Sequence, residues 1–416
     1  MKPHLFKLFL TEFRKRKKKT ALITFAIAWG SLSLLLLMSF GRGLSNTFKT
    51  SFSGLGQDLI MVVPGQTSKD YKGLPKGRRI QLYPGDVELL RSRIPEIGII
   101  SPESYTNMTV TYKGKEANRS IHGVYPEFSI LRSQVAQMGG RYIDPEDERL
   151  SKKVAFLGWN VAAELFGDRD PIGKELFINR VPFKVIGVMK KKLQSSSYNI
   201  PDFDVIYIPF ATFSQMYSQR FLDFLQIQPA KKKYSLLIEK RLKEILGKKY
   251  RFAANDEYAL GIFNTIQMAE EAGKVFLGIE AFLGLIGALT LLIAAVGVAN
   301  LMYAIVKERT KEIGIKMALG AKRRHITIQF LLEALFIFLK GTFWGTLIAF
   351  NIVGLVRLIP VGYDFSEMYT YLLRPEFSLD ILLIFISVMG ILVFLSGIFP
   401  ALKASKLNPV EALRYE

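Results

Sequence analysis

Side chains that could perform hydrolysis or hold a metal ion are few in this chain and lie far apart. The three histidines are His4, His122 and His325, and none belongs to an H-E-x-x-H sequence, which would place two zinc ligands on one helix face. No G-x-S-x-G sequence provides the strained turn of a nucleophilic serine. The chain has no cysteine, which excludes disulfides and cysteine metal sites. The sequence therefore predicts no catalytic, cofactor-binding or metal-binding residue, and a protein that is not itself an enzyme.

A phosphate-binding loop is also missing. In the sequence G-x-x-x-x-G-K-[ST], backbone N–H groups surround the phosphates and the Ser or Thr hydroxyl binds Mg²⁺. Gly-Lys pairs occur at Gly114-Lys115, Gly173-Lys174, Gly247-Lys248 and Gly273-Lys274, but Glu, Glu, Lys and Val follow them. These 416 residues are therefore not expected to bind ATP.

Acidic residues gather at Asp144, Glu146, Asp147 and Glu148. Beside Pro145 they are interpreted as an exposed turn, because proline pre-sets turn backbone and carboxylates favour water. A metal site at this cluster is the less favoured alternative.

One segment, residues 307–338, combines dense charge with helical spacing. Glu312 and Lys316 form an i,i+4 pair in the favourable order. Ile313 and Met317 lie four residues apart and predict an apolar stripe on the same short helix. Such a stripe suits a groove on a partner protein. The alternative is an ordinary solvated loop.

The short helix is predicted to end at Leu319-Gly320, since glycine tolerates the left-handed conformation that closes many helices. The basic residues Lys322, Arg323 and Arg324 then lead into the next apolar run. The charged segment is thus a compact loop held between two long apolar segments.

Four apolar runs are long enough to cross a bilayer, which takes about 20 residues. A signal peptide is the rejected alternative for the first run, because its apolar part is too long and no cleavage site follows. Lysine and arginine concentrate in both tails and in the charged loop, which places these parts in the cytoplasm. The predicted parts are a basic cytoplasmic tail at 1–19, transmembrane helices at 20–40, 275–306, 328–357 and 379–402, an extracytoplasmic domain with a stalk at 41–274, a cytoplasmic coupling loop at 307–327, an extracytoplasmic loop at 358–378 and a cytoplasmic tail at 403–416.

The external segment predicts two strand-helix-strand units around a β-rich insert. The first unit has strands at 59–63 and 99–105 around a helix that opens at 84–86, and the second has strands at 224–227 and 250–253 around a helix at 234–246. The insert has strands at 108–112, 120–124, 154–157, 176–178 and 183–188 and a helix at 160–166. The fold class is an α+β membrane protein with four transmembrane helices and a large extracytoplasmic α/β domain between the first and second.

From about Asn255 the pattern predicts a helix that continues into the second span without an intervening proline. It is either an amphipathic linker or a stiff stalk that carries movement outward, and the pattern does not separate the two.

Two features of the third span indicate helix contacts. Gly341 and Gly345 have the GxxxG spacing that permits close helix approach, or they are chance glycines in a membrane helix. Lys340 is an ionisable residue inside an apolar run, and Glu333 lies two turns earlier. Lys340 either extends its charged end toward the cytoplasmic surface or pairs with Glu333 or a partner helix.

The net charge of +20 does not require a nucleic acid. Much of it lies in the predicted cytoplasmic tails and loop, where it fixes orientation and meets anionic membrane lipid.

The loop and the C-terminus resemble FtsX-like permeases. The matching runs are Glu308-Arg309-Thr310-Lys311-Glu312-Ile313-Gly314, Ala318-Leu319-Gly320-Ala321, Phe330-Leu331-Leu332-Glu333-Ala334, Pro400-Ala401-Leu402-Lys403-Ala404 and Leu407-Asn408-Pro409-Val410-Glu411-Ala412-Leu413-Arg414. The external part is similar to the MacB-type periplasmic core domain at Leu165-Phe166-Gly167, Asp170-Pro171-Ile172-Gly173 and Phe183-Lys184-Val185-Ile186-Gly187-Val188.

This resemblance implies a permease subunit of a mechanotransmitting ABC transporter in the cytoplasmic (inner) membrane. Such a permease couples ATP hydrolysis by an ATPase to export or extraction of a substrate at the outer side of that membrane. MacB carries an N-terminal ATPase, whereas the first apolar run here begins near Thr20. The ATPase, with its ATP and Mg²⁺, is therefore expected on a separate subunit. The resemblance places the ATPase contact on Glu308, Arg309, Glu312, Ile313, Lys316, Leu319 and Arg323.

The resemblance also implies a second permease subunit, identical or different, and membrane lipid as partners. A periplasmic adaptor and an outer-membrane duct are implied where the cell has an outer membrane. Two alternatives share the topology: a lipoprotein-releasing permease of the LolC/LolE kind, and an FtsX-like signal transducer that controls cell-wall hydrolases. The substrate is not identified by the sequence.

Overall fold

The computed structural model of the chain describes residues 17–56, 58–192, 194, 199–218, 220–359, 374–407 and 412. The predicted basic tail up to residue 16, most of the predicted loop at 358–378 and most of the chain after residue 407 lie outside the described residues. The chain divides into two compact units. One is built from long helices, and the other is a mixed unit drawn mainly from residues 48–273.

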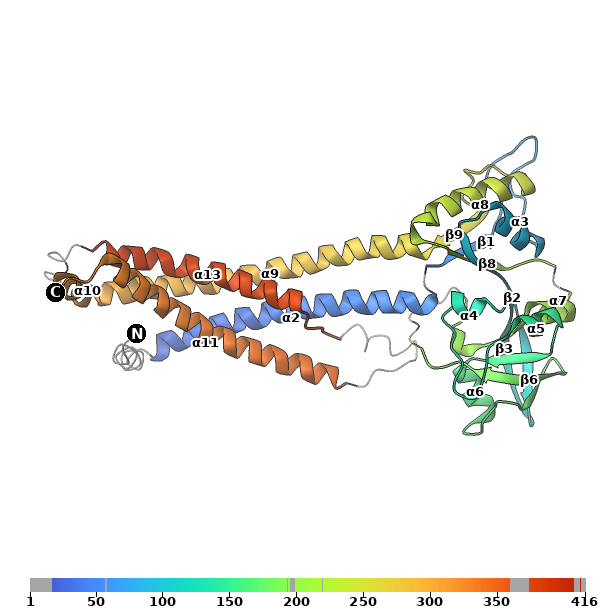
Figure 1. The fold of residues 1–416 in the computed structure, drawn as a ribbon, viewed down its shortest axis with the longest axis horizontal. Helices are drawn as coiled ribbons and strands as arrows, with labels where there is room; N and C mark the ends of the chain where they lie inside the picture. The colour runs from blue at the N-terminus through green and yellow to red at the C-terminus, as the bar shows by residue number, and fades with distance from the viewer. Residues whose placement is uncertain are drawn as a thin grey trace. The chain divides into compact units, whose positions relative to one another are not determined.

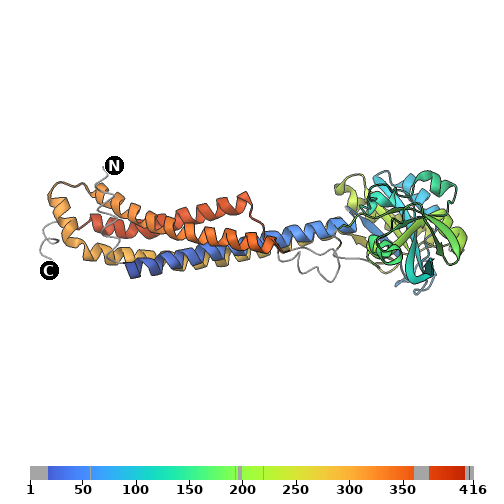
Figure 2. The ribbon, with the colours of Figure 1, turned by 90° about the horizontal axis from the view of Figure 1, so that it is seen from below.

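Four helices of the helical unit are long and apolar enough to cross a membrane. All four exceed the roughly 20 residues that a span needs, since α2 has 39 residues, α9 has 44, α11 has 35 and α13 has 27. The start of α2, the short helix α10, the start of α11 and the end of α13 lie at the same end of this unit in both views (Figures 1 and 2). The helices are α2 (Lys17–Leu55), α9 (Thr265–Glu308), α10 (Thr310–Ala318), α11 (Arg323–Arg357) and α13 (Leu379–Ser405).

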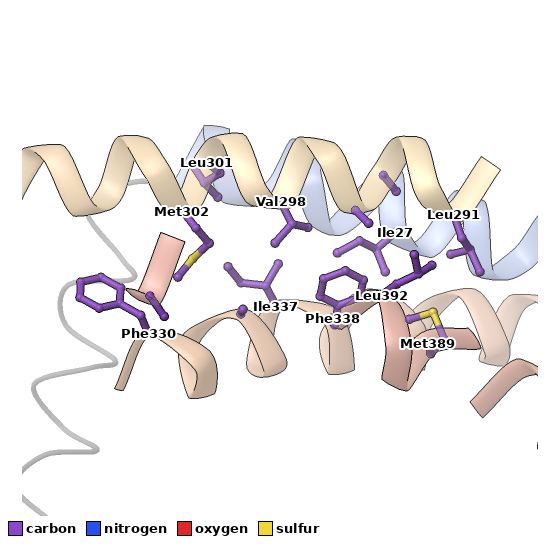
Figure 3. Packing of buried hydrophobic residues seen from close by; sticks show 14 of the residues in the cluster. Ile27, Leu291, Val298, Leu301, Met302, Phe330, Ile337, Phe338, Met389 and Leu392 are labelled. Carbon is purple, nitrogen blue, oxygen red and sulfur yellow. The ribbon is translucent and has the colours of Figure 1, made fainter. Parts of the chain in front are cut away.

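The core of the helical unit is a cluster of aliphatic and aromatic side chains contributed by all four long helices. Figure 3 shows Ile27 of α2, Val298 of α9 and Phe338 of α11 pointing toward one another, with Leu392 of α13 beside them. The outward faces are apolar as well, and many of their large side chains are exposed. A helix that is apolar on all sides is typical of a membrane span.

Charges mark the ends of the four spans. The stretches at 20–41, 281–306 and 381–402 contain no Asp, Glu, Lys or Arg. Within residues 326–356 the only Asp, Glu, Lys or Arg residues are Glu333 and Lys340. Because charge within a bilayer is costly, these two side chains need a specific environment.

The mixed unit contains one sheet with the strand order β3-β7-β4-β6-β5-β2-β8-β1-β9, and β3 also pairs with β2. That second pairing closes β2, β3, β7, β4, β6 and β5 into a ring of strands. The long strand β2 belongs both to this ring and to the open part of the sheet. The strands are β1 (Ile60–Pro64), β2 (Ile97–Tyr112), β3 (Lys115–Val124), β4 (Val154–Leu157), β5 (Glu175–Ile178), β6 (Val181–Val188), β7 (Val205–Pro209), β8 (Phe224–Pro229) and β9 (Leu260–Asn264).

The open part consists of four antiparallel strands in the order β2-β8-β1-β9. The chain visits it as β1-α3-β2 and later as β8-α8-β9, with α3 at Gly85–Arg93 and α8 at Ser235–Tyr250, which is the ferredoxin-like arrangement. Both helices lie beside β1, β8 and β9 in Figure 1. They bury Val87 and Leu90 from α3 and Ile238, Leu242 and Leu246 from α8 in one apolar cluster.

Two sequence predictions about the mixed unit are wrong. The predicted strand at 250–253 does not form, because α8 extends to Tyr250 and Arg251 ends it in the left-handed conformation with φ of 53°. The predicted helix from Asn255 does not begin there either. The Asp256 carboxylate accepts hydrogen bonds from the backbone N–H groups of Ser68 (2.8 Å) and Lys69 (3.1 Å), which holds an irregular segment before β9. Helix α9 therefore begins only after β9, at Thr265.

The predicted strands at 99–105 and 108–112 form the single strand β2. Its residues from Glu103 to Tyr112 pair without interruption with β3, so the polar residues between the two predicted strands stay in the ladder. Alternation of residue types alone did not reveal this pairing.

Candidate functional site

The short helix α10 is joined to the end of α9 by a continuous set of hydrogen bonds. The N–H of Arg309 donates to the Ile305 carbonyl (3.0 Å), and the N–H of Ile313 donates to the Arg309 carbonyl (2.9 Å). The Thr310 hydroxyl donates to the carbonyls of Val306 (3.1 Å) and Lys307 (2.8 Å). The helical hydrogen bonding is thus hardly interrupted where the chain turns from α9 into α10.

The other end of α10 is closed by a glycine, as the sequence predicts. Gly320 has φ of 93°, a left-handed conformation that a side chain would strain. Its N–H donates to the Met317 carbonyl (3.1 Å), and the N–H of Ala321 donates to the Lys316 carbonyl (2.9 Å). These two bonds form a Schellman motif, so the end of α10 has a defined geometry.

The prediction that Ile313 and Met317 form an apolar stripe open to a partner is wrong. Ile313 is 3% exposed and lies in the core of the helical unit, and Met317 packs against that core. The apolar side chains that α10 leaves in the open are Ile315, 45% exposed, and Leu319, 83% exposed. They are also four residues apart, so α10 has two apolar stripes and only one of them is free to meet a partner. In this position Ile313 can position α10 but does not reach outward.

The charged residues expected at the contact lie on the outside of the loop. Glu308, Glu312, Lys316 and Arg323 are all exposed, and the Lys316 ammonium donates to the Gln329 amide oxygen (3.4 Å). Their exposed charges lie along the same short segment as Ile315 and Leu319. The loop therefore presents an apolar pair within a charged border, the usual pattern of a polar-rimmed protein contact.

Arg309 and Glu333 come from the two separate predicted sets, and the structure brings them together. The Arg309 guanidinium donates to the Glu333 carboxylate (2.8 Å), and the two side chains are only 17% and 7% exposed. Removing one partner of a buried ion pair costs about 3–5 kcal/mol, because the other charge remains buried without compensation. The pair ties the start of α10 to the first third of α11.

Lys340 is exposed, and its ammonium lies 5.8 Å from the centre of the Phe336 ring. Phe336 is one turn closer to the start of α11, so the side chain reaches back along the helix. This geometry agrees with the alternative in which Lys340 extends its charged end along α11 toward the start of that helix.

Gly341 and Gly345 lie in close contact with α2. A Cβ atom on Gly341 would lie 2.6 Å from the Ile27 Cβ, and one on Gly345 would lie 2.7 Å from the Ser31 Cβ. Real Cβ atoms do not approach so closely, so both positions require glycine for this packing. The GxxxG spacing thus serves a contact within this chain.

The acidic cluster at 144–148 is not a simple exposed turn, which corrects that interpretation. Asp144 and Asp147 cap a short helix reciprocally, and Asp147 is buried. Burial alone raises the pKa of Asp147, but the Arg141 guanidinium and the backbone N–H of Asp144 lower it below the usual range. The Glu148 carboxylate accepts from the backbone N–H of Ala211 (3.0 Å). Among the described residues no group of three or more His, Asp or Glu is placed to hold a metal ion.

Glu148 should make the stability of the protein depend on pH. Burial raises its pKa from 4.5 to about 7, although the N–H groups of Ala211 and Phe210 oppose this. The folded chain then binds more protons at this site than the unfolded chain between these values, so stability falls as pH rises through that window. We expect Glu148→Gln to remove this fall, a gain on the order of 2 kcal/mol at pH 8.

The measurement is thermal unfolding of the intact chain in detergent at pH 5, 6, 7 and 8. Glu146→Gln is the matched control, because Glu146 is exposed in the same short helix. An unchanged pH dependence in the Glu148→Gln variant would contradict the assignment.

A buried polar network in the sheet has the residue types of a catalytic triad. His122 contacts the Glu103 carboxylate through Nδ1 (2.7 Å) and the Ser120 hydroxyl through Nε2 (3.1 Å). The Gln226 amide also donates to Glu103 (2.8 Å). Ser120 is 2% exposed, so a substrate would not reach its hydroxyl. The network instead joins β2, β3 and β8 where the ring of strands meets the open part of the sheet.

The fold and the loop define a membrane protein with several spans and a β-rich domain inserted between the first two of its long apolar helices. Residues 20–245 match the family model described as the MacB-like periplasmic core domain, and residues 284–409 match the FtsX-like permease C-terminal domain. The first match covers more than half of the chain. The chain belongs to the MacB/FtsX-like family of ABC transporter permeases, which confirms the resemblance. Four apolar helices and a domain of the periplasmic type fit a multi-pass protein of the inner membrane.

The macrolide export ATP-binding/permease protein MacB of Bdellovibrio bacteriovorus is 28% identical over 416 residues, covering 99% of this chain and 62% of that protein. MacB of Vibrio parahaemolyticus is 28% identical over 409 residues, covering 98% of this chain and 59% of that protein. The chain spans less than two thirds of the length of these relatives. The periplasmic region of MacB from Actinobacillus actinomycetemcomitans aligns with a TM-score of 0.43 at 19% identity, covering 53% of this chain and 94% of that one.

Proposed function

We propose that this chain is the permease part of a mechanotransmitting ABC transporter. ATP hydrolysis by a separate ATPase subunit is coupled to export or extraction of a substrate at the outer side of the cytoplasmic membrane. The observation that carries the proposal is the loop around α10. It exposes Ile315 and Leu319 within a charged border, and the Arg309–Glu333 pair joins it to two spans at once.

The orientation follows from charge. The start of α2, the end of α13 and α10 share one end of the helical unit (Figures 1 and 2), and the sequence is rich in Lys and Arg near all three. By the positive-inside rule this end lies in the cytoplasm, where an ATPase subunit could reach α10. The domain between α2 and α9 then lies outside.

Helix α9 is the element through which motion would be passed. It runs without a break for 44 residues, or about 66 Å, and the charged loop follows it directly. Only part of this length is needed to cross the hydrocarbon core of a bilayer. This supports the stiff stalk over the amphipathic linker, and its motion would reach β9 at the start of the helix.

The partners follow from the same proposal. They are the ATPase, a second permease subunit and membrane lipid, with an adaptor and an outer-membrane duct where an outer membrane exists. The two curated relatives described above are named for macrolide export and for ATP binding. For this chain we propose a substrate taken up on the outer side, without assigning its chemical class.

The proposal is tested by affinity purification of the intact chain in mild detergent, with co-purifying proteins and ATP hydrolysis as readouts. We expect an ATPase subunit with a phosphate-binding loop to accompany the chain and to hydrolyse ATP. Purification of a folded chain without any ATPase would overturn the proposed coupling. A cell-wall hydrolase as the main external partner would favour the signal-transducer alternative.

A further inference from the structure

A second cluster of charges joins three of the long helices at the end of the helical unit away from α10. Arg42 of α2 pairs with Asp380 at the start of α13, and its guanidinium also lies 3.5 Å from the carboxylate of Glu280 on α9. Asn46 donates to Glu376, which precedes α13. We call these five residues the Arg42 node.

Two of the three contacts in the node are made by the Arg42 guanidinium. The side chains of Arg42 and Glu280 are 25% and 14% exposed, whereas Asp380 is 65% exposed. Among the described residues, Arg42 is the cation that lies within ion-pair distance of Glu280. A guanidinium offers five donors in a planar fork, so it can hold carboxylates from two different helices at once.

The node lies at the level where α13 begins, and beyond it α2 and α9 continue without α13. Helix α13 starts at Leu379, next to the node, while α2 continues beyond it to Leu55 and α9 reaches back to Thr265. The helices are also in close contact there, since a Cβ atom on Gly41 would lie 3.2 Å from the Leu283 Cδ1. A displacement of α9 by one turn, about 5.4 Å, would move Glu280 away from Arg42 and leave a half-buried carboxylate without its cation.

We propose that the Arg42 node fixes the axial register of α2, α9 and α13 at the outer end of the spans. An axial movement of α9 then carries α2 and α13 with it, and α9 does not slide between them. This inference concerns the helices of this chain alone and holds whether the protein exports a substrate or transmits a signal.

The test uses cysteine cross-linking, for which the chain is well suited because it has no cysteine of its own. Gly41→Cys is combined with Leu283→Cys, called the in-register pair because the Leu283 Cδ1 is the atom nearest to a Cβ at position 41, or with Ile279→Cys, which is one turn away. Oxidation is followed in membranes that contain the intact chain. We expect the in-register pair to form a disulfide at least about tenfold faster than the shifted pair, because a disulfide needs Cβ atoms about 3.5–4.5 Å apart.

Arg42→Gln in both double-cysteine proteins should reduce this preference to less than about twofold by the loss of the ion pairs. Lys274→Gln is the matched control, because Lys274 is an exposed cation of α9 outside the node and should leave the tenfold preference intact. If Arg42→Gln does not reach the membrane, Glu280→Gln removes only the α9 contact and should have the same effect on register.

Two outcomes would overturn the proposal. In the first, the in-register pair has no advantage in the otherwise unchanged chain. In the second, the advantage survives both Arg42→Gln and Glu280→Gln, which would show that apolar packing alone sets the register.

Discussion

Replacement of Leu319 by aspartate is expected to weaken binding of the ATPase subunit at least about tenfold, while the chain itself still folds. Leu319 is 83% exposed at the end of α10, so the change leaves the core of the helical unit untouched. At a contact, the same change places a carboxylate where an apolar side chain was buried. Central contact residues contribute about 2 kcal/mol or more, and 1.4 kcal/mol is a factor of ten in affinity.

The measurement is the amount of ATPase that co-purifies with the chain, together with the rate of ATP hydrolysis. Ile315→Asp should act in the same direction, with a smaller effect because Ile315 is only 45% exposed. Leu236→Asp is the matched control, since Leu236 is an exposed leucine of α8 in the other unit.

Ile313→Asp is expected to affect folding of the chain itself, in contrast to Leu319→Asp, which should affect only the contact with the ATPase. Ile313 is buried in the helical core, so aspartate there should lower the yield and thermal stability of the chain itself. Undiminished ATPase binding by a folded Leu319→Asp chain would show that the partner does not contact the exposed stripe.

The two stripes of α10 show why sequence could predict the loop but not its contact surface. Ile313 and Met317 have the same spacing as Ile315 and Leu319, and helical periodicity does not distinguish them. Which pair is buried depends on how α10 turns against α9 and α11. That turn is set by Arg309 and by the hydroxyl of Thr310, whose partners lie on or beside those helices.

The four spans could be located because long apolar runs leave few alternatives. The ends of the stalk were harder, since the pattern before the second span continues through β9 with helix-compatible residues such as Phe263. Strand β9 forms through its pairing with β1, from Ile60–Asn264 to Pro64–Leu260, which is a contact about 200 residues away in sequence. Local pattern carries no information on such a pairing.

The polar contacts between spans were the least predictable. The sequence indicates Glu333 as an ionisable residue in a span, and in the structure its carboxylate accepts from Arg309, 24 residues earlier. Arg42 and Glu280 are 238 residues apart and could not be matched from one sequence. In both cases the cost of burying charge indicates that a partner must exist, but only the helix packing identifies it.

Gly345→Leu is expected to lower the stability of the chain by about 3 kcal/mol. Any side chain at Gly345 meets α2, because its Cβ would lie 2.7 Å from the Ser31 Cβ and in contact with the backbone of Ala28. A backbone cannot move aside as a flexible side chain does. The helices α2 and α11 must therefore separate, which opens the core around Ile27 and Phe338.

The measurement is thermal unfolding of the intact chain in detergent, with yield from membranes as a second readout. Gly354→Leu is the matched control on the same helix, since a Cβ there has no neighbour within 4 Å and the side chain would face outward. Leucine at 354 also improves helix propensity by roughly 1 kcal/mol over glycine, so this variant should be at least as stable as the parent. If Gly345→Leu unfolds at the same temperature as the parent, α11 does not rest on α2 at this glycine. The close approach of the first and third spans would then be wrong.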